Sequence, residues 1–189
     1  MYWGFTSVVL RVLIPLAIVA FVFRESLASY GWTWRGQLRH VPRYAALYVA
    51  MIPVVLLAAS LSSFQLKYPF YKSAADGGAA FWGYEFVYGL QFMGVETFFR
   101  GFLTFALFRR FGYWALPMMC VPYVMVHFNK PLPEALAALG AGLVLGYMAL
   151  RAGSCVLGIF LHWSIGFTMD VLAIAKITGG FGNALRQIF

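Results

Sequence analysis

The sequence predicts an all-α protein, a polytopic membrane helix bundle of about six transmembrane helices. Of its 189 residues 62% are apolar and only 11% are charged, whereas soluble domains carry roughly 25% charged residues. The apolar residues fall in runs near the roughly 20 residues that a helix needs to cross a bilayer. Short segments rich in glycine, proline and charge separate the runs. We therefore expect a single integral membrane domain over residues 1–189, with no large soluble domain.

Six segments are expected to form the helices. The third is about 29 residues long, more than a span requires, so it must tilt strongly, break, or begin as an interfacial stretch. In the fifth, Gly142 and Gly146 form a G-x-x-x-G spacing that lets two helices approach closely. The six segments cover residues 5–23, 43–64, 80–108, 113–128, 134–150 and 154–175.

The first apolar run is expected to be a retained span and not a signal peptide. Arg11 precedes a hydrophobic stretch, as in a signal peptide, but the run is long for that class of segment. It has no A-x-A-like cleavage site, and Arg24-Glu25 follows it directly.

The net charge of +8 does not indicate a nucleic-acid partner. Such a partner would need a basic patch on a soluble face, and here the cations lie between apolar runs. We interpret them as topology signals: by the positive-inside rule the arginine-rich loops are cytoplasmic and both termini lie outside. His40 lies in one of these loops and is expected to be solvated, and Cys120 and Cys155 are expected to pack inside the bundle. The arginine-rich set is Arg24, Arg35, Arg39, Arg43, Arg109, Arg110 and Arg151, and the opposite set is Lys67, Lys72, Lys130, Lys176 and Arg186.

One charged pair stands inside an apolar helix. Glu96 and Arg100 are four residues apart, so they share a helix face and can pair. Ionisable residues in a bilayer cost a few kcal/mol each and by default mark functional sites. The alternative is a structural ion pair that holds the helix inside the bundle.

Two histidines converge on this pair. Glu96 precedes Phe111 by 15 residues and His127 follows it by 16, so antiparallel helices joined near Phe111 bring both side chains to one depth. His162 follows the turn at Gly153 by about ten residues and can reach the same region if its helix tilts. Asp170, two turns further along, is expected at the membrane interface.

Such a set supports hydrolysis. A partly desolvated carboxylate can act as general base on a water, one histidine can hold that water, and a second can stabilise the developing oxyanion. Arg100 then holds the segment and modulates Glu96. Two His and one Glu also form a known zinc set, but no H-E-x-x-H spacing supports zinc here. We therefore expect no metal and no cofactor.

The ordered motifs Val95-Glu96-Thr97-Phe98-Phe99-Arg100-Gly101, Tyr123-x-x-x-His127 and His162 resemble the CPBP family of CAAX-protease and bacteriocin-processing intramembrane endopeptidases, also called the Abi family. The similarity runs from about residue 83 to 170, a protease-like core. It implies peptide-bond hydrolysis by a glutamate-activated water, with Glu96, His127 and His162 catalytic and Arg100 and Tyr123 supporting. It also implies a membrane-anchored or C-terminally signalled protein substrate and a place in a bacterial or archaeal cytoplasmic membrane.

The chain departs from the family motifs at two positions. In the family's E-E-x-x-x-R motif the first glutamate falls on Val95, and the asparagine of H-x-x-x-N falls on Gly166. Either Glu96 serves as base, with its helix turned by about 100°, the rotation per residue, or the chain is a non-catalytic membrane binding or immunity module. A transporter is disfavoured, because broken helices in two matching halves are not evident.

Overall fold

The structure is a computed structural model that describes residues 2–189. In this range it contains helices and connecting loops and no strand, which confirms the all-α class. The first helix consists of α1 (Tyr2–Val8), η1 (Val9–Leu13), α2 (Ile14–Ala17) and η2 (Ile18–Phe23). The other elements are η3 (Leu27–Tyr30), η4 (Gln37–His40), α3 (Val41–Ala59), α4 (Ser62–Lys67), η5 (Lys72–Asp76), α5 (Gly78–Glu96), η6 (Thr97–Leu103), α6 (Thr104–Phe111), η7 (Gly112–Trp114), α7 (Ala115–Met125), α8 (Leu132–Ala152), α9 (Val156–Ile177) and α10 (Phe181–Ile188).

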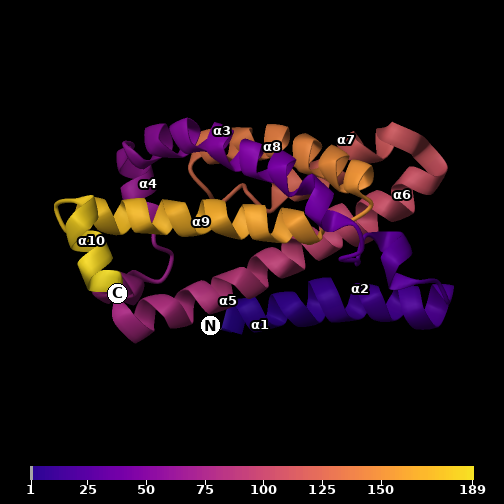
Figure 1. The fold of residues 1–189 in the computed structure, drawn as a ribbon, viewed down its shortest axis with the longest axis horizontal. Helices are drawn as coiled ribbons and strands as arrows, with labels where there is room; N and C mark the ends of the chain where they lie inside the picture. Colours follow the sequence, from indigo (N-terminus) through magenta and orange to yellow (C-terminus); the bar gives the residue numbers. More distant parts are fainter. Residues whose placement is uncertain (1) are drawn as a thin grey trace.

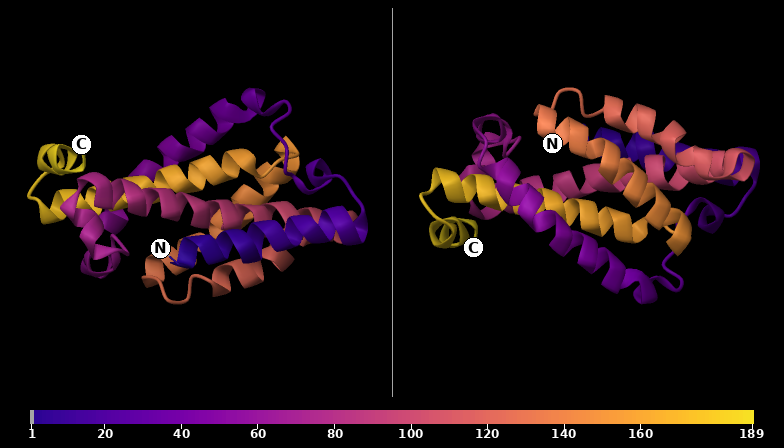
Figure 2. Two further views of the ribbon diagram at one scale, coloured as in Figure 1. Left: turned by 90° about the horizontal axis from the view of Figure 1, so that it is seen from below. Right: turned by 90° about the horizontal axis from the view of Figure 1, so that it is seen from above.

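The long helices run side by side along the long axis of the molecule (Figures 1 and 2). The first helix packs along α5, α9 packs between α5 and α3, and α7 packs on α8. Within residues 2–189, four helices are long and apolar enough to cross a membrane: Tyr2–Phe23, Gln37–Ala59, Leu132–Ala152 and Val156–Ile177. The predicted total of six spans remains a prediction.

The third predicted segment neither breaks nor starts as a separate interfacial stretch. It runs as continuous helix through α5, η6 and α6, and crosses the bundle obliquely (Figure 1). Its η6 part is a wider π-helical turn that begins directly after Glu96. Such turns are rare and are frequent at functional sites.

Two sequence predictions need correction. The second segment ends at Ala59 and not at residue 64, because Leu61 is extended before the short α4 begins. His40 is buried, not solvated, and its ring accepts a hydrogen bond from Arg39 Nε at 3.1 Å. Asp170 is completely buried within the protein, and its depth at the membrane interface stays a prediction.

The C-terminal helix α10 was not predicted, because it is too short to give a membrane-span signal. Its Ala184 and Ile188 are buried in a cluster with α5 and α9, and Gln187 donates to the carbonyl of Ala75. The helix therefore closes one end of the bundle.

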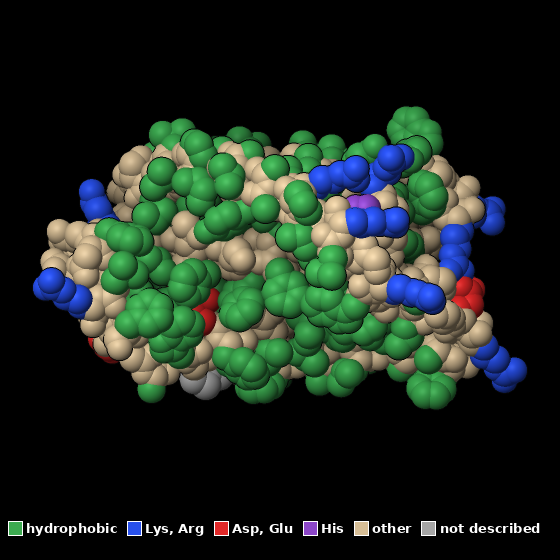
Figure 3. Space-filling view, in the orientation of Figure 1, with side chains coloured by type: hydrophobic (Ala, Val, Ile, Leu, Met, Phe, Trp, Pro, Cys, Tyr) green, Lys and Arg blue, Asp and Glu red, His purple; other side chains and the backbone are tan. Residues whose placement is uncertain are grey.

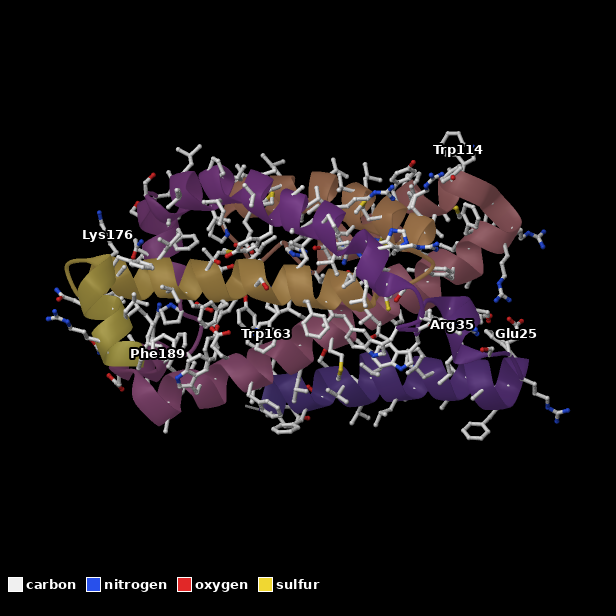
Figure 4. All side chains as sticks on the ribbon, viewed as in Figure 1. Glu25, Arg35, Trp114, Trp163, Lys176 and Phe189 are labelled. Atoms are coloured by element: carbon white, nitrogen blue, oxygen red, sulfur yellow. The ribbon has the colours of Figure 1, made fainter. Side chains whose placement is uncertain are left out.

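Positive side chains gather at the opposite end (Figure 3). Arg35 lies there, while Lys176 lies near α10 (Figure 4). This separation agrees with the two predicted sets of loops. Which end faces the cytoplasm, and therefore where the termini lie, stays a prediction.

The G-x-x-x-G prediction is confirmed where α7 meets α8. A Cβ added at Gly142 would lie 2.6 Å from Cys120 Sγ and 3.0 Å from the Tyr123 ring, whereas one added at Gly140 would meet nothing within 4 Å. Gly142 thus lets α8 approach the part of α7 that carries Tyr123.

We predict that Gly142→Leu destabilises the protein by about 1–3 kcal/mol, the usual cost of overpacking. Thermal unfolding in detergent checks this, with Gly140→Leu as the matched control. Equal melting temperatures for the two variants would show that α7 and α8 do not pack closely.

Candidate active site

Glu96 and Arg100 form the expected pair at the junction of α5 and η6. Arg100 Nη1 lies 3.0 Å from Glu96 Oε1, and both side chains are completely buried. The Arg100 guanidinium also stacks on the Tyr123 ring, 3.7 Å from its centroid. Such cation–π contacts are strongest where water is excluded. Tyr123 therefore supports Arg100 from α7, the helix that α8 approaches closely at Gly142.

His162 reaches Glu96 directly from α9. Its Nδ1 lies 2.8 Å from Glu96 Oε1, the oxygen that also contacts Arg100. A carboxylate accepts this bond, so Nδ1 carries the hydrogen and Nε2 of the neutral ring keeps a lone pair. The ring packs on Phe92 with centroids 4.5 Å apart, which fixes its plane.

His127 follows the last turn of α7 and is held differently. Its Nδ1 lies 2.9 Å from the carbonyl oxygen of Tyr123 and donates to it, and its ring packs on the Tyr123 ring. Its Nε2 therefore also keeps a lone pair. The sequence placed His127 at the depth of Glu96, whereas the structure puts His162 in contact with the carboxylate.

Two adjoining cavities share these histidines. The larger, of about 390 Å³, is mostly apolar and lies between α3, α8 and α9; the smaller, of about 130 Å³, lies toward the first helix. The two have five wall residues in common, namely Tyr88, Phe92, His127, Lys130 and His162.

Val95 and Glu96 face different surroundings. Val95 lines the smaller cavity, and Glu96 lines neither. Glu96 instead faces α9, where a Cβ added at Gly158 would lie 2.9 Å from its Oε2. The helix is therefore not turned to present Glu96 to the cavities, and valine occupies the wall next to the histidines.

Gly166, at the other departure from the motifs, lines the larger cavity. A Cβ added there would lie 2.7 Å from the Phe92 ring. Phe92 therefore occupies the space that a side chain at position 166 would need, so an asparagine does not fit without movement of that ring.

Two further polar groups were not assigned to the site from the sequence. Glu134 lines the larger cavity, where it accepts from Tyr68 Oη at 2.7 Å and pairs with Lys130. The spacing of Lys130 and Glu134, four residues apart at the start of α8, was a usable signal. Elsewhere, Trp163 on α9 points toward α5 (Figure 4), and its Nε1 donates to the buried Glu85 at 3.1 Å.

Residues 2–189 contain no group of three or more His, Cys, Asp or Glu side chains close enough to hold a metal ion. Glu96 contacts His162 and Arg100 through Oε1, whereas its Oε2 has no hydrogen-bond partner among the described residues. That the protein works without metal remains a prediction.

We predict that Glu96→Ala lowers the free energy of unfolding by about 3–5 kcal/mol, because it leaves the Arg100 charge buried and unpaired. The double variant Glu96→Gln/Arg100→Met is expected to recover most of this loss, since it removes both charges. Chemical unfolding in detergent measures both. A double variant less stable than Glu96→Ala would contradict the pairing.

One known family model matches the part of the chain that contains this site. The family model described as "Type II CAAX prenyl endopeptidase Rce1-like" matches residues 77–168, just under half of the chain. No curated protein and no solved structure matches the chain. The matched segment contains Glu96, Arg100, Tyr123, His127 and His162, all the motif residues. The match confirms the resemblance to the CPBP family: residues 77–168 of this integral membrane protein are similar to the Rce1-like endopeptidases.

Proposed function

We propose that the protein is an intramembrane endopeptidase that cleaves the C-terminal tail or signal segment of a membrane-associated protein, with a water activated through Glu96 and His162. The protease family of the matched segment supports peptidase activity at the family level. The observation that carries the mechanism is the 2.8 Å contact between Glu96 Oε1 and His162 Nδ1, with His162 on the wall of both cavities.

In this mechanism Glu96 acts through His162. The buried carboxylate holds the Nδ1–H of His162 and stabilises the imidazolium that forms, as the carboxylate of a hydrolase triad does. His162 Nε2 takes a proton from the water, whose oxygen attacks the peptide carbonyl. The imidazolium then gives that proton to the leaving amine as the C–N bond breaks.

The remaining residues position these groups. His127 Nε2 accepts the second hydrogen of the water, since its Nδ1 is held by the Tyr123 carbonyl. Arg100, stacked on Tyr123, keeps Glu96 ionised and fixed. Both are positioning roles, because neither side chain transfers the proton.

The larger cavity supports an apolar substrate. Its volume of about 390 Å³ lies in the usual range for ligand sites, roughly 300–1,000 Å³, and α3 and α8 supply aliphatic walls. A lipid-modified C-terminus, the substrate type in the name of the matching family, and an apolar C-terminal sorting signal both fit such a wall.

A second candidate function is a non-catalytic binding or immunity module. Val95 on the wall of the smaller cavity favours it, because a valine cannot take a proton from water. In that reading the Glu96 pair is structural and the cavities only bind a tail.

We predict that the wild-type protein in nanodiscs cleaves a membrane-tail peptide and that His162→Ala lowers kcat/KM by about 10²–10⁴, the usual contribution of an acid–base group. Glu96→Gln and His127→Ala, which misplace His162 and the water, are each expected to lower kcat/KM by about 10². Mass spectrometry of the products measures this, and a chelator is expected to have no effect. The exposed Arg186→Ala serves as control. Peptide that binds but is not cleaved by any folded form would support the second candidate.

Val95→Glu separates the two functions. It adds a carboxylate to the cavity wall beside the histidines, and Val95→Gln is its matched control. We expect the wild type to be active already and Val95→Glu to change kcat/KM by less than about tenfold, since His162 supplies the base. Cleavage by Val95→Glu alone would instead show that the natural protein is non-catalytic.

A further inference from the structure

Arg11 carries a charge in the middle of the first membrane span. It is the tenth residue of the helix Tyr2–Phe23 and lies in its η1 part, outside the Rce1-like segment. A charge at this depth is costly and usually faces a partner or a cavity. The ion pairs found within residues 2–189 join Glu96 to Arg100 and to His162, Glu25 to Arg109, and Glu134 to Lys130. No carboxylate of this part of the chain compensates Arg11.

Arg11 lines the smaller cavity. Lys130 also lines it, and no Asp or Glu of the described chain does. Lys130 is already paired with Glu134, so Arg11 supplies the uncompensated positive charge. A small cavity of this kind favours an anion, because the low dielectric around it strengthens the attraction.

Gln91 adds a second polar side chain with an unsatisfied atom to the same cavity. Its side chain lines the same cavity and is 7% exposed, and its Oε1 has no hydrogen-bond partner. Buried polar atoms without a partner are rare and call for an explanation. Gln91 can accept from Arg11 while its amide NH₂ donates to a bound anion.

We infer that the smaller cavity binds the free C-terminal carboxylate of the tail substrate, with Arg11 as its charge partner and Gln91 as a donor. The substrate assignment rests on the proposed function. The position of the two cavities supports it: they adjoin at wall residues that include both histidines, so a tail that extends from the larger cavity to Arg11 would pass the histidines. The peptide bond at His162 would therefore lie close to the end of the chain, which limits cleavage to C-terminal segments.

The test is a binding measurement that does not need cleavage. Two fluorescent tail peptides of one sequence, ending in a free carboxylate or in an amide, are titrated against the full-length protein in zwitterionic nanodiscs. The wild-type protein is the background, and both peptides carry non-hydrolysable bonds near the C-terminus, because a Glu96 variant would release His162, which lines both cavities. We expect the carboxylate peptide to bind about 10- to 100-fold tighter, the range for a hydrogen bond to a charged group. Arg11→Met is expected to abolish the difference and Arg11→Lys to retain part of it.

The melting temperature of Arg11→Met distinguishes a carboxylate-binding role of Arg11 from a structural role. Removing an uncompensated charge from the span is expected to leave the melting temperature of Arg11→Met equal or higher. A lower melting temperature with unchanged discrimination between the peptides would overturn the inference. So would equal binding of both peptides by the background protein, or competition by anionic lipid alone, which would assign the cavity to a lipid headgroup. Loss of discrimination in Arg11→Met, with no cleavage by wild type, would retain the carboxylate site and refute only the peptidase.

Discussion

The buried contact between Glu96 and Arg100 is the interaction on which the rest of the site depends. Both side chains are completely buried, and two buried charges are costly unless their other contacts are good. Here the protein supplies two more: the Tyr123 ring under Arg100 and the His162 imidazole on Glu96. Because these come from α7 and α9, one ion pair on the α5–η6 helix fixes the position of three elements.

Val95 and Glu96 are consecutive in the sequence, but their side chains have different surroundings. Residues next to each other on a helix point about 100° apart, so Val95 and Glu96 cannot both face the histidines in the same way. The chain places Val95 on the cavity wall and Glu96 behind it, against Gly158 and His162. Glu96 lines neither cavity and contacts His162, which is why we propose that it acts through this histidine. The rotation of this helix therefore places the valine on the cavity wall and brings the carboxylate into contact with His162.

Much of the fold followed from the sequence, because apolar runs of span length and their breakers are local signals. The i,i+4 spacing of Glu96 and Arg100 and the glycine spacing of α8 were local in the same sense. The histidine that contacts Glu96 could not be predicted from local spacing. Helix tilt decides whether His127 or His162 reaches the carboxylate, and residue spacing does not report tilt. The burial of Asp170 and His40 and the docking of α10 likewise depend on contacts between elements distant in the sequence. The orientation of Val95 required the actual rotation of α5, which a single motif leaves open.

The most direct test of the central claim is a double-mutant cycle for cleavage with Glu96→Gln, His162→Ala and their combination. Residues that act as one unit show non-additive losses in kcat/KM. If Glu96 acts only through His162, the double variant should be no slower than His162→Ala, within about a factor of two. Losses that multiply in the double variant would show that Glu96 acts on the reaction independently of His162, and would contradict this account.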